Sequence, residues 1–343
     1  MGLADRFAEL HQRKFVNIFH HRNSGRLGAL ARGLVALSLL AQFCLFARTA
    51  CAADETSKAS RYALKAEHVW RIDLPDGERF DASALCFDGN GKLLTLSDRG
   101  LKIYRLEAPP KSDTAKLTWL TNLFPEAKLK PFSNQKADRL DVEGIGRDES
   151  GRIYVSEEGN RWILRTDAEG KNVERLDIDW KPVQKYFSGD PNASFEGVAA
   201  GDGKIFVANE RSVGRIIVVD QKSLKILDDF QVQPIGMIAR DVHYSDLSWF
   251  KGELWVLCRE SFVVLRVDPK THKVLSEYHY GDVEKDLDSL YYYLYPTGNM
   301  EGLAVDDDTI WLVTDNNGMA RVRAPKDTRP TLFRCPRPDA PKK

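Results

Sequence analysis

Short blocks of apolar and polar positions run along most of this chain, and the same block returns five times. Each block has a short apolar segment, a turn rich in Gly, Asp or Asn, and a second, continuous apolar run. Gly, Asp and Asn supply the backbone geometry of tight hairpin connections. The second runs are short and rich in branched and aromatic side chains, which favours buried strands over helices. They are Leu93–Leu96, Ile153–Val155, Ile205–Ala208, Leu254–Leu257 and Ile310–Val313.

The five copies begin at Ser83, Glu143, Glu196, Asp246 and Glu301, roughly 50 to 60 residues apart, which is the repeat length of propellers and stacked arrays. A third apolar segment follows the hairpin in several copies, and a fourth follows in two of them. The predicted third strands are Trp162–Arg165, Arg215–Val219, Phe262–Val267 and Ala320–Val322. About four strands per copy is the content of a propeller blade.

The ends of the repeat region indicate how the ring closes. His68–Leu74 precedes the first copy and resembles the outer segment Val173–Ile178, whereas the last copy has only Thr331–Cys335 as a candidate outer strand. We therefore predict an all-β fold, a single β-propeller whose N-terminal strand completes the last blade. Five blades is the direct count and six is the alternative. Amphipathic helical stretches between strand pairs are absent, which argues against an α/β fold, and residues 281–295 can hold one short helix in a loop insertion.

The N-terminal region has the pattern of a targeting segment. Residues 34–47 form an uncharged apolar run after Arg26 and Arg32, and small residues surround Cys51 behind it. This order is typical of a secretory signal, and the run is shorter than the ~20 residues that span a bilayer. We predict export to the periplasm or the medium, with membrane contact only if the signal stays uncleaved as an anchor. The predicted divisions are a signal peptide in 1–53, a linker in 54–65, the propeller in 66–335 and a tail in 336–343.

Charge and cysteine content narrow the function classes. The chain carries 50 basic and 50 acidic residues, so its net charge is zero and no basic footprint for nucleic acid is present. Beyond the signal, Cys86, Cys258 and Cys335 are an odd number, which excludes a full disulfide framework. We expect a monomer that acts on a small molecule or an envelope ligand.

Acidic residues recur at two matched positions in the later copies. The first opens the inner strand of the repeat, and the second closes the strand that runs back. The pairs are Glu143 with Glu157, Glu196 with Glu210, Asp246 with Glu260, and Glu301 with Asp315; the first copy has Ser83, then Ser97 with Asp98. In a propeller these side chains meet at one mouth of the central channel. Two like charges about 4 Å apart repel by about 4 kcal/mol at an effective dielectric of about 20, so a ring of them needs compensation.

Three arrangements would relieve this repulsion, and the sequence leaves all three open. Ca²⁺ on the axis would take carboxylate oxygens, with Asn209 and Asn316 adding carbonyl ligands. Arginines beside the closing positions would instead form ion pairs with these acidic side chains and link neighbouring blades. Some carboxyls would otherwise hold protons, because mutual repulsion raises their pKa. The arginines in question are Arg99, Arg161, Arg211 and Arg259.

Several motifs are missing, and other residues have structural interpretations. A G-x-S-x-G serine motif is absent. The histidines beyond the signal show no zinc spacing, and a lone histidine such as His243 is interpreted as a loop or core residue. Aromatic residues recur at one place in the blades and are interpreted as packing between blades. They are Phe206, Trp249, Trp255 and Trp311.

As a set, the acidic motifs resemble those of the exported phytase-like propeller proteins, a family described by an esterase-like activity of phytase and akin to the SdiA-regulated periplasmic proteins. The motifs are Asp141–Ile145, Ser156–Glu158, Phe195–Gly197, Asn209–Arg211, Ser245–Ser248, Glu260, Glu301–Ala304 and Thr314–Asn316. The resemblance implies a β-propeller with a metal-capable acidic mouth and phosphoester hydrolysis. The first copy departs from the pattern at Ser83, which leaves one side of the ring open for substrate or water.

The leading hypothesis is therefore metal-dependent phosphoester hydrolysis with Ca²⁺. The ion would polarise a phosphoryl oxygen and make a bound water more acidic. Glu157 or Glu210 would take the proton of that water, and the four arginines would hold the remaining phosphate charge. The predicted metal ligands are Glu143, Glu196, Asp246, Glu260, Glu301, Asp315, Asn209 and Asn316. The alternatives are a non-catalytic, calcium-stabilised binding module and a metal-dependent lactonase or esterase.

Overall fold

The computed structural model describes residues 59–341, except 75–76, 133–139, 191, 237–241 and 293–297. The chain divides into Met1–Ser57 and Lys58–Lys343, and every described residue belongs to the second unit. The predicted signal peptide and the beginning of the predicted linker lie outside the described residues. Within these ranges no helix is both long and apolar enough to cross a bilayer.

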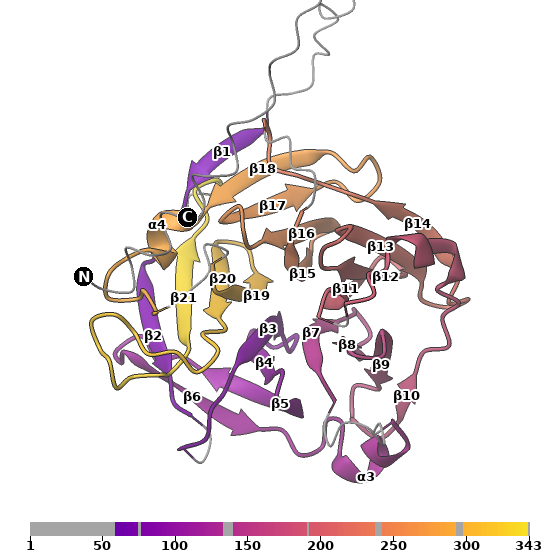
Figure 1. The fold of residues 1–343 in the computed structure, drawn as a ribbon, viewed down its shortest axis with the longest axis horizontal. Coiled ribbons are helices and arrows are strands. Elements are labelled where there is room, and N and C mark those ends of the chain that lie inside the picture. Colours follow the sequence, from indigo (N-terminus) through magenta and orange to yellow (C-terminus); the bar gives the residue numbers. More distant parts are fainter. Residues whose placement is uncertain are drawn as a thin grey trace, which may run out of the picture. The chain divides into compact units, whose positions relative to one another are not determined.

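The described residues form four β-sheets, in agreement with the all-β prediction. Three of these sheets each contain an antiparallel meander of four strands that are consecutive in the sequence (Figure 1). The first sheet holds β7 (Val142–Arg147), β8 (Ile153–Glu157), β9 (Trp162–Thr166) and β10 (Val173–Arg175). The second holds β11 (Phe195–Gly201), β12 (Lys204–Asn209), β13 (Arg215–Asp220) and β14 (Ile226–Phe230). The third holds β15 (Tyr244–Phe250), β16 (Glu253–Cys258), β17 (Val263–Val267) and β18 (Val274–His279), with β1 (Ser60–Ala63) parallel to β18.

The fourth sheet joins the two ends of the repeat region. One half holds β3 (Ala82–Phe87), β4 (Leu93–Ser97), β5 (Gly100–Glu107) and β6 (Thr114–Trp119). The other half holds β19 (Met300–Val305), β20 (Thr309–Thr314), β21 (Thr331–Pro336) and β2 (His68–Ile72). A parallel pairing of β2 with β6 links the halves.

The predicted closure by the N-terminal strand is confirmed, because β2 pairs antiparallel with β21 and His68 lies opposite Arg334. One prediction within the last copy is wrong. Its third strand is β21, which pairs with β20, whereas residues 320–322 hold only isolated bridges at Arg321. The short apolar segment there lacks the length to form a ladder beside β20.

Helices in the described ranges are short and lie in loops. They are α3 (Glu126–Leu129), α4 (Gly281–Glu284) and the 3₁₀ helices η3 (Lys130–Phe132) and η4 (Lys181–Tyr186). The α4 helix falls in the insertion where one short helix was predicted.

The innermost strands contact one another in a closed cycle, in the order β3, β7, β11, β15, β19 and back to β3. Glycines that follow the glutamates of the repeats permit this close approach. A Cβ atom on Gly144 would lie 2.5 Å from the backbone oxygen of Glu196, and one on Gly197 would lie 2.5 Å from the Cα of Asp246. A side chain at either position would push neighbouring strands apart, which explains the recurring Glu-Gly pair.

Apolar side chains fill the space between neighbouring sheets. Trp249 of β15 stacks on Phe206 of β12 with ring centroids 5.2 Å apart, as predicted for packing between repeats. Cys86, Cys258 and Cys335 are buried and make no disulfide among the described residues. Hydrophobic burial between sheets therefore holds the inner strands, and with them the polar residues at their ends, in fixed positions.

Candidate functional site

Each innermost strand carries a β-bulge near its beginning, and the bulges decide which polar side chains meet. The pairing with the next strand shifts register there, because one extra residue is inserted on the inner strand. The bulged positions are Ser83, Glu143, Glu196, Ser245 and Glu301. We call this end of the inner strands the acidic mouth.

The bulges change the pairs that the equal spacing indicated. Val142, not Glu143, lies opposite Glu157, and the backbone N–H of Glu158 donates to the carbonyl of Asp141 at 2.8 Å. The residue that accompanies Glu143 at the acidic mouth is therefore Glu158. The equivalent positions in the five repeats are Asp98, Glu158, Glu210, Arg259 and Asp315.

Two groups of three carboxylates converge at the acidic mouth. The first triad is Asp98, Asp141 and Glu143, and the second triad is Glu158, Glu196 and Glu210. In each triad, one oxygen of every residue lies within 4.8 Å of the others. Each triad combines residues from two neighbouring repeats. Carboxylate oxygens at this spacing suit a hard divalent cation such as Ca²⁺.

The raised pKa values of the triad carboxyls indicate that a bound cation would stabilise their ionised forms. Burial raises the pKa of Glu143 well above its ordinary value, and the charge of Glu158 adds to the effect. Burial also raises the pKa of Glu196 well above its ordinary value, with Glu210 as the next cause. The pKa of Glu158 is raised to about 8, first by burial and then by Glu210. Each carboxyl resists ionisation unless a cation compensates it.

Glu143 and Glu196 are the triad carboxylates that a bound cation would stabilise most. In the part of the chain that the structure describes, neither side chain makes a hydrogen bond or ion pair, and both are partly exposed. One carboxylate oxygen of Glu158 is buried and also lacks a hydrogen bond there. The residues present therefore fit a bound cation.

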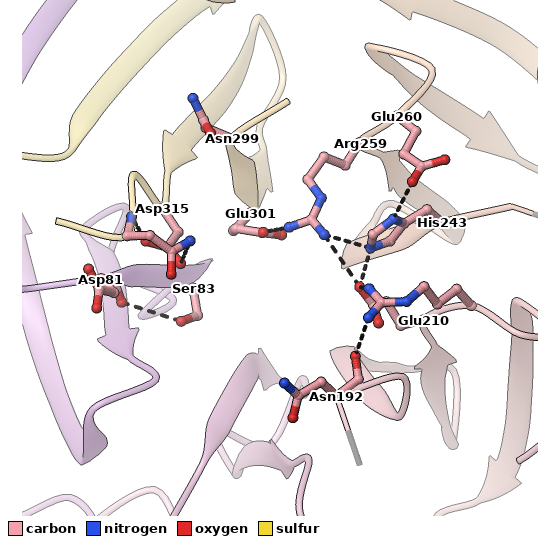
Figure 2. Close-up of polar contacts among 12 residues, drawn as sticks. Asp81, Ser83, Asn192, Glu210, His243, Arg259, Glu260, Asn299, Glu301 and Asp315 are labelled. Carbon is pink, nitrogen blue, oxygen red and sulfur yellow. Dashed lines mark hydrogen bonds and ion pairs between the residues drawn. The ribbon is translucent and has the colours of Figure 1, made fainter. Parts of the chain in front are cut away.

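The fourth repeat places Arg259 where the other repeats place an acid. Its Nη1 contacts Glu301, while its Nη2 lies 3.4 Å from Oε1 of Glu210 and 2.7 Å from Nε2 of His243 (Figure 2). His243 is buried; its Nε2 also contacts Glu210, and its Nδ1 lies 3.1 Å from Oε1 of Glu260. This side of the acidic mouth is thus neutralised by the protein itself.

His243 was interpreted from the sequence as a structural residue, and its place in this network was missed. It precedes the bulge of its repeat by two residues, as Asp81 and Asp141 do in theirs. That offset is the signal that links it to the acidic mouth, and it becomes visible only once the bulge is located.

A second set of polar contacts lies across Figure 2 from His243, around Asp81 and Asp315. Asp81 accepts a hydrogen bond from Nε of Arg79 at 2.8 Å, and Nη1 of Arg99 lies 3.6 Å from its other oxygen. The pKa of Asp315 is raised to about 7 by burial and then by Asp81, although the backbone N–H of Asn317, at 2.7 Å, acts against this. Arginine compensation operates here as well.

Arg211 and Arg161 differ in what they reach. Arg211 ion-pairs with Glu210 and donates to the carbonyl of Asn192 at 2.8 Å. Arg161 instead donates to the carbonyl of Ser188 at 3.0 Å and makes no ion pair with a described carboxylate. Burial lowers the pKa of Arg161, and the charge of Glu158 acts against this, so Arg161 still lies within electrostatic reach of the second triad.

Asp246 has a different position from the other predicted ligands. It is fully buried, and its Oδ2 accepts backbone N–H groups of Leu303 at 2.7 Å and Leu85 at 3.3 Å. Its Oδ1 accepts the N–H of Leu247 at 2.8 Å. Because β15 and β3 are not neighbours in the cycle of inner strands, this carboxylate reaches across the axis. Burial raises its pKa well above the ordinary value, against the effect of the three donors.

Glu157 and the two predicted asparagine ligands hold loops. Glu157 accepts the backbone N–H of Asn160 at 2.8 Å, and burial raises its pKa. The Nδ2 groups of Asn209 and Asn316 donate to backbone carbonyls of the loops that follow them, at 2.8 Å and 2.6 Å. The Oδ1 atoms of both asparagines are buried and make no hydrogen bond with described residues.

Comparison with known proteins places the fold and the family. A family model described as "Phytase-like: Esterase-like activity of phytase" matches residues 81–318. No curated protein matches the chain. A glutaminyl cyclase of Myxococcus xanthus has a similar solved structure, with 13% identity, coverage of 81% of this chain and 97% of the other, and a TM-score of 0.54. A virginiamycin B lyase of Staphylococcus aureus is 14% identical over 79% of this chain and 74% of its own, with a TM-score of 0.40.

At such low identity the cyclase match shows the fold alone, and that fold is a β-propeller. The family model covers well over half of the chain and includes both carboxylate triads. The chain belongs to the phytase-like family.

Proposed function

We propose that this protein is a Ca²⁺-dependent phosphoester hydrolase that works at the acidic mouth of a five-bladed propeller. The observation that carries the proposal is the convergence of two carboxylate triads in which Glu143 and Glu196 have no partner among the described residues. The five-blade count is supported by five meanders of four strands and by the closed cycle of five inner strands among the described residues.

The first triad, together with Glu196, would hold the ion. Bound Ca²⁺ supplies Lewis-acid polarisation of a phosphoryl oxygen and a bound water of lowered pKa. We assign the role of proton acceptor to Glu158 and not to Glu157, because the Glu157 carboxylate already accepts hydrogen bonds from Asn160. The raised pKa of Glu158 makes its carboxylate a stronger base than an ordinary one, and a cation bound beside it would favour the ionised form that takes a proton from water. Arg259 and Arg211 lie beside Glu210 and would orient the phosphate.

The cellular setting is part of the proposal. The basic, apolar and small-residue order of the first 53 residues supports export to the periplasm or the medium. We propose a monomer whose partner is a small phosphoester or an envelope ligand.

Phosphate release from phytate and from p-nitrophenyl phosphate tests the reaction. The purified protein is expected to turn over at least one of them with Ca²⁺ and to stop when a chelator is added. Glu143→Gln and Glu196→Gln should each lower the Ca²⁺-dependent rate by tenfold or more. Glu174→Gln serves as a matched control, because that side chain is 57% exposed and outside both triads. Absence of turnover while Ca²⁺ still raises the melting temperature would overturn the hydrolase assignment.

A non-catalytic, calcium-stabilised binding module is the second candidate. The network of Arg259, His243 and Glu210 favours it, because that side of the acidic mouth is already balanced without a substrate. A lactonase or esterase with the same metal is the third candidate, since Arg99, Arg211 and Arg259 are all ion-paired and a neutral ester needs no arginine. Assays with lactones and p-nitrophenyl acetate separate the third candidate from the first.

A further inference from the structure

A cavity of 560 Å³ opens at the other end of the inner strands. Its lining includes Phe87, Arg147, Phe250 and Val305, which are the last residues of β3, β7, β15 and β19. The carboxylate triads lie at the first residues of the inner strands. Because these strands run in the same direction around the axis, the cavity and the acidic mouth lie at opposite ends.

Asp246 separates the two ends. Its buried carboxylate binds backbone N–H groups of β3 and β19 across the axis, and Leu247 and Ser248, the next residues of β15, already line the cavity. A molecule in the cavity is therefore kept apart from the triads. The cavity constitutes a site of its own, and its properties follow from its own lining.

Each acidic residue of this lining has a hydrogen-bond or ion-pair partner, and Arg147 has none among the described residues. Asp306 accepts the indole N–H of Trp311 at 3.1 Å, and Asp307 is ion-paired with Lys251. Asp148 is ion-paired with an arginine, and Glu149 accepts a backbone N–H. Arg147 makes no hydrogen bond or ion pair within the described ranges.

Two glycines leave room for the guanidinium of Arg147. A Cβ atom on Gly89 would lie 2.5 Å from its Nη1, and one on Gly151 would lie 3.2 Å from its Nη2. The guanidinium thus occupies space beside both turns that a side chain at either glycine would fill. A planar guanidinium without a partner is suited to a carboxylate, which it binds through two parallel hydrogen bonds.

An aromatic wall forms another part of the cavity. The indole of Trp249 stacks on Phe206, with an interplanar angle of 17°, and crosses Gly201, where a Cβ atom would lie 2.0 Å from the indole Nε1. Phe87 and Phe250 add apolar surface. A volume of this size is within the roughly 300–1,000 Å³ of small-molecule sites, which combine apolar walls with a few placed polar groups.

We propose that this cavity is a second ligand site, which binds a small aromatic carboxylic acid. The carboxylate pairs with Arg147 and the ring packs beside Trp249. The site works independently of the acidic mouth, so binding requires no Ca²⁺.

Calorimetric titration of the full chain with 2-naphthoate tests this site. We expect saturable binding that a chelator leaves unchanged. The neutral 2-naphthamide and the cationic 2-naphthylmethylamine should each bind at least tenfold more weakly, because neither can form the two charge-assisted hydrogen bonds to the guanidinium.

Two variants locate the ligand. Arg147→Gln should weaken 2-naphthoate by at least tenfold, and Arg147→Lys should fall between it and the native protein because the charge stays and the fork is lost. Glu143→Gln, at the opposite end, should bind 2-naphthoate like the native protein. Circular dichroism and the melting temperature check that each variant is folded.

Three results would overturn the proposal. They are no binding of 2-naphthoate to the native protein, equal binding to a folded Arg147→Gln variant, and tighter binding of the amine than of the acid. None of these results bears on phosphoester hydrolysis, which is measured at the other end with Ca²⁺.

Discussion

The two sides of the acidic mouth are built from the same repeat and balance their charge in different ways. On one side, Glu143 and Glu196 have raised pKa values and no partner among the described residues. On the other side, Arg259 occupies the position of an acid and contacts both Glu210 and Glu301. An arginine at the equivalent position of one repeat thus supplies the positive charge that, under the proposed function, a bound Ca²⁺ supplies on the other side.

Removal of Arg259 is expected to have the largest effect on the difference between the two sides. Arg259→Met leaves Glu210 and Glu301 without their shared cation, and loss of one partner of a buried ion pair costs about 3–5 kcal/mol. Urea denaturation is expected to show a loss of this size, and saturating Ca²⁺ should restore part of it. Arg99→Met is the matched control, because Arg99 is 40% exposed and an exposed pair contributes only about 0–1 kcal/mol. Equal losses in the two variants would mean that the two sides are alike.

Substitution of Asp246 tests whether its carboxylate stabilises the fold by linking β3 and β19 across the axis. Asp246→Ala leaves buried N–H groups of Leu85 and Leu303 without acceptors, and each unsatisfied group costs about 1–3 kcal/mol. We expect a loss of roughly 2–5 kcal/mol for Asp246→Ala in urea and a smaller loss for Asp246→Asn, which keeps one acceptor oxygen. If alanine and asparagine behave alike, the carboxylate does not act as the bridge described here.

The affinity for Ca²⁺ tests the side of the acidic mouth that holds Glu143 and Glu196. Glu143→Gln and Glu196→Gln should each weaken Ca²⁺ binding about tenfold or more in calorimetric titration, because a ligand charge is lost. In the absence of Ca²⁺ the same variants should be at least as stable as the native protein, since a neutral amide removes like-charge repulsion. Unchanged Ca²⁺ affinity in both variants would place the ion elsewhere.

The smallest expected effect is a dependence of stability on pH. A carboxyl whose pKa is raised in the folded state keeps a proton that the unfolded chain releases, so ion-free stability falls as pH rises between the two values. For Glu158 this window runs from 4.5 to about 8. The melting temperature in chelator should fall across this window, and the increase produced by Ca²⁺ should be larger at its upper end. A smaller calcium effect at high pH would contradict the role of these carboxyls.

The fold could be predicted from the sequence because its repeat is local. Each hairpin has its own turn residues and apolar run, and the residue pattern of β2 alone resembles that of an outer strand. The third strand of the last copy was harder, because β21 follows β20 after a long loop and carries no spacing signal of its own.

The site was predicted less fully, for a reason that lies in the bulges. Glu157 and Glu158 are adjacent, so they point to opposite faces of a strand, and one inserted residue on the partner decides which of them reaches the acidic mouth. The same shift places Ser245, and not Asp246, at the bulged position of the fourth repeat. No residue type marks a bulge in this sequence, so the equal spacing of the acids does not show which of two adjacent residues reaches the acidic mouth.

The pairing of β2 with β21 has a consequence for how the protein reaches its native state. His68 and Arg334 come from opposite ends of the repeat region, so their ladder is among the most distant in sequence and is expected to form late. Until it forms, the facing edges of β2 and β21 lack their partners, and open edges recruit strands from other chains. Aggregation therefore competes with folding chiefly at the moment the ring is sealed.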